Sequence, residues 1–226
     1  MNNERVINIL SKIDYFSKLD STALELISEA ALQQTYQEGQ IIFAEGEPCI
    51  GLYIVEYGWI RAVKISAEGR EQTIRFVGPG DVFNEVGVMA GGVNLVTVEA
   101  LEPVKLLIIQ RDIILGLVEQ HSTLAIMLIE NLAKRVLYAM NMVVGLSLHS
   151  VESRLARFLL TEAKDNIISR KKWTTQAFIA AQIGTVPVVI NRAFCSFVED
   201  EIIELERDQI MILNNPELQK IATLTE

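Results

Sequence analysis

The side chains best suited to recognise a ligand lie in residues 187–198, near the carboxyl end of the chain. Ile190, Phe194 and Phe197 recur at helical spacing and predict a buried helix face. The same spacing turns a second set toward solvent: Val188, Asn191, Arg192 and Cys195. A guanidinium can pair with guanine or hold a phosphate, an amide can pair with adenine, and valine can contact a thymine methyl group. The exposed face therefore carries chemistry suited to nucleic acid.

The flanking residues predict a helix-turn-helix followed by a wing. Thr175 can cap a short first helix, Gly184 can end it, and Pro187 suits the first position of the next helix. That order is the spacing of a helix-turn-helix. The runs 202–206 and 209–213, joined by a turn, predict two wing strands. Further candidate DNA contacts in this region are Thr175, Thr185, Lys171 and Lys172.

The charge of the chain is unusual for a protein that binds DNA. The formal net charge of the 226 residues is −9, whereas nucleic-acid modules usually carry a basic face. Residues 1–150 hold 11 Lys and Arg against 18 Asp and Glu, while residues 151–226 hold 9 against 11. Contact with DNA must therefore depend on local basic patches. Residues 170–172 form the densest run of basic residues. The structural alternative for Arg192 is that it packs locally or pairs with an acid such as Glu199.

The amino-terminal half predicts an antiparallel β domain. Short β-branched and aromatic runs at 40–44, 52–55, 60–65 and 72–77 are separated by turns that contain glycine. Even spacing of short strands and turns is typical of a barrel or jelly roll. Residues 6–29 are predicted to be helical before the first strand, because apolar residues there fall at helix-like spacing.

A long helix is predicted over residues 122–146. Seven apolar residues repeat there at steps of four and three: Ala125, Ile129, Leu132, Val136, Ala139, Val143 and Leu146. Such a sustained seam predicts pairing with a partner helix, and so a homodimer. The alternative is a helix that packs only on its own barrel. Ser150 can cap a further helix over 151–163, and a polar loop over 164–172 is expected to follow.

Several segments together resemble the Crp/Fnr transcription regulators. They are EGQIIFAEGE (38–47), LYIVEYGWIR (52–61), GREQT (69–73), GPGDVF (78–83) and VESRLARFLL (151–160). The resemblance implies an α+β fold with an antiparallel jelly roll of the cyclic-nucleotide-binding type, a dimerisation helix and a winged helix-turn-helix. The expected domains are an effector-sensing domain at 1–121, a dimerisation helix and hinge at 122–149, and a DNA-binding domain at 150–226.

The helix-turn-helix retains the scaffold of this family more than its DNA-reading face. Scaffold positions that match are Thr175, Ile179, Ala180, Ile183, Gly184, Thr185, Ile190 and Arg192. Val188 stands where the family usually has Glu, and Asn191 where it usually has Ser. Cys195 replaces a basic residue, and Glu201 replaces the small residue that opens the wing. DNA binding is expected, on a site that differs from the usual one of the family.

The residues that hold a cyclic nucleotide in relatives are largely replaced. The Gly-Glu pair corresponds to Asn84-Glu85, and the Arg-Ser/Thr pair about ten residues on corresponds to Asn94-Leu95. Two hydroxyl residues that face adenine correspond to Ala139 and Met140. A phosphate without its cationic clamp is costly to bury, which argues against ordinary cyclic AMP. The expected pocket comprises Asn84, Glu85, Met89, Asn94, Leu95, Arg135, Ala139 and Met140. It either binds a less charged small-molecule effector or is filled by its own side chains.

Other chemistries find little support. The two cysteines, Cys49 and Cys195, are too few for an iron–sulfur cluster, and no metal-ligand set is evident. Haem stays open because His121 and His149 exist, although neither lies in a recognisable ligand pair. No phosphate-loop, HExxH or GxSxG motif indicates an enzyme. Without a signal peptide or spanning segment, the chain is expected in the cytoplasm, away from membranes.

The expected function is that of a homodimeric regulator that binds double-stranded DNA at a near-palindromic site. The effector is unknown, and RNA polymerase is a candidate partner. The rival reading is a degenerate regulator that serves as a protein-interaction module. The acidic net charge, Val188 and Glu201 favour the rival, while Gly184, Pro187 and Arg192 oppose it.

Overall fold

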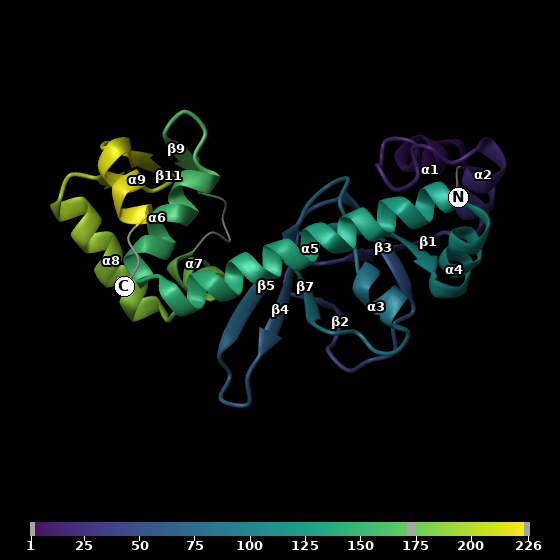
Figure 1. Cartoon of the computed structure of the whole chain (residues 1–226), viewed down its shortest axis with the longest axis horizontal. Coiled ribbons are helices and arrows are strands. Elements are labelled where there is room, and N and C mark those ends of the chain that lie inside the picture. Colours follow the sequence, from purple (N-terminus) through teal and green to yellow (C-terminus); the bar gives the residue numbers. More distant parts are fainter. Residues whose placement is uncertain (1–2, 171–174, 224–226) are drawn as a thin grey trace. The chain divides into compact units, whose positions relative to one another are not determined.

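A computed structural model describes residues 3–170 and 175–223. The chain forms two compact units (Figure 1). The first comprises residues 1–65 and 74–137, and the second comprises residues 66–73 and 138–226. Among the described residues, no single helix is long and apolar enough to cross a membrane. Two sharply bent helix pairs reach that length and composition, each only as a pair.

The first unit begins with two helices, α1 (Asn3–Leu10) and α2 (Ser21–Ala30). The expectation of a helical segment over 6–29 is confirmed at its two ends but wrong for residues 11–19, which form successive tight turns. Backbone bonds between residues three apart join Ile13 to Leu10, Phe16 to Ile13 and Leu19 to Phe16. Asp20 then caps α2 by accepting a 2.8 Å bond from the amide of Ala23. The apolar spacing that suggested a helix instead buries these turns in the core.

Two four-stranded antiparallel sheets form the jelly roll and confirm the predicted fold class. One sheet has the order β1-β8-β3-β6, and the other has the order β2-β7-β4-β5. The strands are β1 (Leu32–Tyr36), β2 (Ile41–Phe43), β3 (Gly51–Tyr57), β4 (Ile60–Ile65), β5 (Glu71–Val77), β6 (Val82–Phe83), β7 (Thr97–Ala100) and β8 (Val104–Gln110).

The two central strands β3 and β8 are buried on both faces. Along β3, Leu52 and Ile54 pack with the helices, whereas Tyr53 and Val55 point into the space between the sheets. The alternate residues of β8 divide in the same way. This double burial explains why both strands read as nearly continuous apolar runs. Between the sheets, Phe43, Tyr53 and Phe83 form an aromatic cluster, with the Tyr53 and Phe83 ring centroids 4.9 Å apart.

Three further helices complete this unit: α3 (Glu85–Ala90), α4 (Arg111–Gln120) and α5 (Ser122–Leu148). The predicted long helix is confirmed over 27 residues. Near its amino end, Leu124 and Leu128 are buried in the core that contains α1, α2 and α4. The helix continues into the second unit beyond Leu137.

The second unit contains the winged helix-turn-helix. Its elements are α6 (Val151–Glu162), β9 (Ile167–Ser169), α7 (Gln176–Ile183), α8 (Pro187–Glu199), β10 (Ile203–Leu205), β11 (Gln209–Ile212) and α9 (Asn215–Thr223). The predicted wing is confirmed as β10 and β11. The expected polar loop over 164–172 is interrupted by β9, which pairs with β11 and buries Ile168, while 171–172 lie outside the described residues. A strand this short depends on its partner strand, which lies about 40 residues later in the chain.

Candidate DNA-binding and effector sites

Local capping signals build the helix-turn-helix. The Thr175 hydroxyl accepts a 3.1 Å bond from the amide of Phe178 and so caps α7. Gly184 ends α7 with φ +72°, a conformation that favours glycine. Pro187 then begins α8, where its missing N–H is not needed. The axes of α7 and α8 meet at a bend of 102°.

The second helix separates apolar from polar side chains as its spacing predicts. Ile190, Phe194 and Phe197 are at most 2% exposed and join the core of this unit. Val188, Asn191, Arg192 and Cys195 are all exposed, so α8 presents the predicted set to solvent. Thr175 is exposed and Thr185 is half-buried. The predicted contacts Lys171 and Lys172 lie outside the described residues.

Asn191 and Arg192 on this exposed face differ in whether they have a partner among the described residues. The Gln176 side-chain amide donates a 3.1 Å bond to Oδ1 of Asn191, joining the start of α7 to α8. Sequence reasoning missed Gln176, because the contact depends on the angle between the two helices. Arg192 forms no ion pair within the described part of the chain, and its guanidinium is exposed. Its donors are therefore available to an external acceptor.

The residue that opens the wing adopts a conformation unusual for its type. Glu201 has φ +55°, in the left-handed region that favours glycine. This geometry would suit the small residue that the family resemblance implies at this position. The carboxylate is exposed and follows Glu199 and Asp200, which gives this end of α8 a local acidic surface.

An amide pair lies where the family resemblance places a phosphate clamp. Asn84, with φ +71°, donates from Nδ2 to Asn94 Oδ1 at 3.0 Å and to the Gly51 carbonyl at 3.1 Å. The same amide lies 3.3 Å from the sulfur of Cys49. Asn94 is 2% exposed, and its backbone is bonded to Gly46 and Glu47. The predicted residues Asn84 and Asn94 thus meet through one hydrogen bond, which engages the side-chain oxygen of Asn94.

A buried ion pair joins α3 to α5. Glu85 on α3 is 2% exposed and accepts hydrogen bonds from Arg135 on α5. Tyr15 lies close by; burial first and the Glu85 charge second raise the pKa of its hydroxyl. Arg75 belongs to the same electrostatic cluster, and burial together with the Arg135 charge lowers the pKa of its guanidinium. The predicted residues Glu85 and Arg135 are therefore direct partners.

The other predicted pocket residues differ in their exposure. Met89 is half-buried against the helical core, and Leu95 is 43% exposed. Ala139 and Met140 are exposed on the part of α5 that belongs to the second unit.

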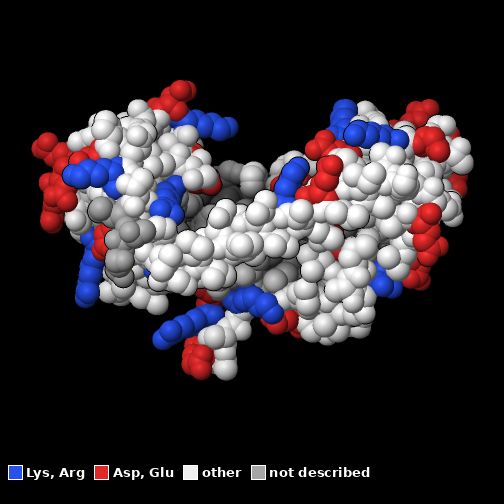
Figure 2. Space-filling view, viewed as in Figure 1, with Lys and Arg blue, Asp and Glu red and all other residues white. Residues whose placement is uncertain are grey.

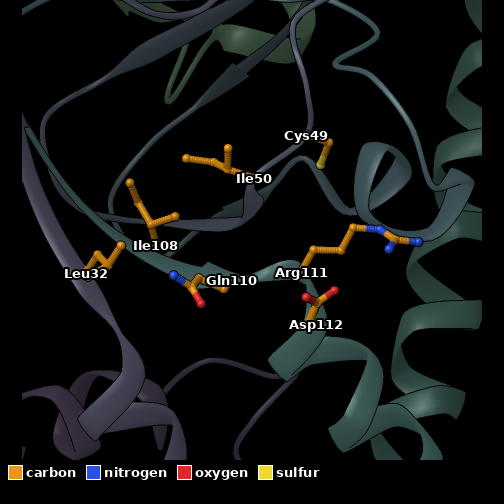
Figure 3. A pocket seen from close by; sticks show the side chains of 7 residues that line it. All are labelled: Leu32, Cys49, Ile50, Ile108, Gln110, Arg111 and Asp112. Atoms are coloured by element: carbon orange, nitrogen blue, oxygen red, sulfur yellow. The ribbon is translucent and has the colours of Figure 1, made fainter.

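A hollow of about 400 Å³ in the first unit is lined by Leu32, Cys49, Ile50, Ile108, Gln110, Arg111 and Asp112 (Figure 3), and it adjoins the amide pair through Cys49. It contains none of the predicted effector residues. Figure 3 shows Arg111 extending away from Ile50 and Gln110. Its Nε donates a 2.9 Å bond to the Val88 carbonyl near the end of α3. Burial raises the pKa of the Cys49 thiol.

The exposed surface of α5 is strongly apolar. Ile129, Val136 and Val143 of the predicted seam are 65%, 58% and 62% exposed, and Leu146 is 43% exposed. Ala139 is also exposed, whereas Ala125 and Leu132 are half-buried. Figure 2 shows this helix as a nearly uncharged strip. An apolar surface that is contiguous along a helix marks an interaction site.

Each of the two units contains a segment that matches the model of a known protein family. Residues 33–121 match the model of the cyclic nucleotide-binding domain, and residues 153–221 match that of the Crp-like helix-turn-helix domain. Together the two models cover more than two thirds of the chain. A CRP-like cAMP-activated global transcriptional regulator of Mycobacterium tuberculosis is 24% identical, over 95% of this chain and 98% of its own.

Solved structures share the fold. A protein from Eubacterium rectale, assigned to the Crp/Fnr family, has a TM-score of 0.75 and 26% identity, covering 95% of this chain and 100% of its own. FixK2 from Bradyrhizobium japonicum has a TM-score of 0.75 at 22% identity, covering 87% and 99%. With both family models matched in order, the chain belongs to the Crp/Fnr family of DNA-binding transcription regulators.

Proposed function

We propose that the protein acts as a homodimer on a near-palindromic DNA site and responds to an effector other than ordinary cyclic AMP. Two α8 helices, related by two-fold symmetry, would read half-sites about one helical turn apart. Arg192 and Asn191 would contact bases or phosphates, and Val188 would contact a thymine methyl group. RNA polymerase is the further partner that a regulator bound near a promoter would meet.

The exposed apolar seam of α5 carries the dimer proposal. Val136 and Val143 are more than half exposed, although each is a large apolar side chain. In a single chain this surface would face water along several helical turns. Burying it against the same surface of a second copy removes that cost and satisfies the four-and-three spacing of a paired helix.

Light scattering of the full chain tests the dimer, with variants on two positions of α5. Val136→Glu would place like charges in a dry seam and cost the dimer several kcal/mol in a desolvated interface. Asn141→Glu, at an exposed polar position outside the seam, is the matched control. We expect a dimer for the wild type and the control, and a monomer for Val136→Glu. A monomeric wild-type protein at micromolar concentration would refute the proposal.

The amide pair supports an effector other than cyclic AMP. Asn84 and Asn94 supply no positive charge, and the side-chain amide of Asn84 already donates to the side-chain oxygen of Asn94. Glu85, the counterpart of the ribose-binding acid in relatives, is engaged by Arg135. A cyclic phosphate would have to break these contacts and would find no cationic clamp to repay the cost of its desolvation.

Titration calorimetry with cyclic AMP and cyclic GMP tests this proposal. We expect no binding at micromolar concentration to the wild-type protein. Asn94→Arg combined with Leu95→Ser should raise the affinity measurably, because the guanidinium supplies the missing charge. Micromolar or tighter binding of either nucleotide to the wild type would refute the proposal.

A further inference from the structure

The corner between α7 and α8 is closely enclosed by the rest of its unit. A Cβ added to Gly184 would lie 2.3 Å from Leu146 Cδ2 and 3.3 Å from Arg154 Nη1. Leu146 belongs to the end of α5, and Arg154 belongs to α6. Glycine is favoured at this corner by its left-handed backbone conformation at φ +72°, whereas the neighbours that a Cβ would meet are the ends of flexible side chains, which can shift.

Arg154 holds the corner by hydrogen bonds to its backbone. Nη1 donates to the Ile183 carbonyl at 2.6 Å and to the Gly184 carbonyl at 3.2 Å. The last carbonyls of a helix have no partner within that helix. A positive charge at this end also interacts favourably with the negative end of the helix dipole. One guanidinium thus serves as the carboxyl-terminal cap of α7.

Arg154 lies on α6, a helix that packs into the core of this unit. It lies in the first turns of α6, which Ser150 caps through a 3.1 Å bond to the amide of Ser153. The next residues along α6, Leu155 and Ala156, are fully buried in the core of this unit. The hydrogen bonds of the guanidinium therefore hold the corner at a defined position relative to α6.

The corner determines where the exposed residues of α8 lie. Pro187 begins α8 three residues after Gly184, and the 102° bend develops over this short stretch. Readout of base edges requires side chains held within about 0.5 Å of their working positions, whereas phosphate contacts tolerate looser geometry. A loosened corner should therefore reduce specific binding more than non-specific binding.

We infer that Arg154 is a positioning residue for DNA recognition, acting by capping α7 and fixing the angle at which α8 is presented. This inference rests on the proposed reading of DNA by α8, but not on the dimer or on the effector. It predicts a loss of sequence discrimination rather than a uniform loss of affinity.

Arg157 provides a matched control in the same helix. Its Nε donates a 2.6 Å bond to the Ala222 carbonyl, near the end of α9. Arg154→Met and Arg157→Met each remove one guanidinium that bonds to a helix-end carbonyl. The first affects the corner before α8, and the second does not.

The experiment compares two DNA probes at several salt concentrations. One is a duplex selected from a random pool by the wild-type full chain, and the other is a scrambled duplex of the same composition. Arg154→Met should reduce the ratio of the two affinities by at least about fivefold, the loss expected when one base contact is misplaced. Arg157→Met should leave the ratio unchanged, and Arg154→Lys, which keeps the charge and an N–H donor, should restore part of it. Thermal unfolding would verify that each variant is folded, and Arg154→Lys provides the comparison if the Met variant is not.

Each contrary result has a distinct meaning. Equal losses on both duplexes, with the salt slope reduced by about one unit, would make Arg154 a phosphate contact and refute positioning. An unchanged ratio, or the same change in both Met variants, would also refute it. A wild-type protein that does not distinguish the two duplexes would refute specific reading itself, and the inference with it.

Discussion

Removing one member of the Glu85–Arg135 pair should destabilise the first unit by an amount that depends on which member is removed. The Glu85 side chain is 3% exposed, whereas that of Arg135 is 28% exposed. Arg135→Met leaves a buried carboxylate without its partner, at a cost of about 3–5 kcal/mol. Glu85→Gln leaves a guanidinium that can turn toward water, at a cost of about 1 kcal/mol. The double variant retains neither charge and should lose less stability than Arg135→Met alone.

Thermal and denaturant unfolding of the four proteins would measure this double-mutant cycle. For Arg135→Met we expect a fall in the unfolding midpoint on the order of 10 °C. Arg61→Met is the control, since it disrupts a partly exposed pair with Glu99 in the same unit and should cost about 1 kcal/mol or less. Equal losses for the two single variants, or losses that simply add in the double variant, would refute the reasoning from burial.

Two further predictions concern the second unit. Arg192→Ala should cost about 1–3 kcal/mol of DNA-binding free energy on the selected site and relax preference at one base pair, as binding titrations would report; Lys172→Ala should lower affinity uniformly, and unchanged DNA binding by Arg192→Ala would refute direct readout. Glu201→Gly should stabilise the protein by about 0.5–1 kcal/mol, because it relieves the left-handed backbone strain at φ +55°. Glu199→Gly, within helix α8, should destabilise it by a similar amount, and unfolding curves that shift in the same direction for both would contradict this explanation.

The sequence determined those features that depend on near neighbours. Thr175, Gly184 and Pro187 predicted the ends of α7 and the start of α8, because capping and backbone preference act within a few residues. Helical spacing then predicted which side of α8 is exposed. Burial of both faces made β3 and β8 visible as apolar runs, since every position along them contributes to a core.

Two segments were misread because their sequence patterns are shared by different structures. Apolar residues three and four apart suit a helix, but they also suit the successive turns that bury Ile13 and Phe16 before α2. The strand β9 was missed because its pairing energy comes from β11 rather than from its own residues.

The tertiary structure alone decided which distant polar groups become partners. Glu85 and Arg135 are 50 residues apart in the chain, and Arg154 lies 29 residues before Ile183. The sequence placed Glu85 and Arg135 in one expected site, yet gave no sign that each would satisfy the other. Side-chain hydrogen bonds extend only about 3 Å, so such pairs follow from how the helices and sheets pack and not from spacing along the chain.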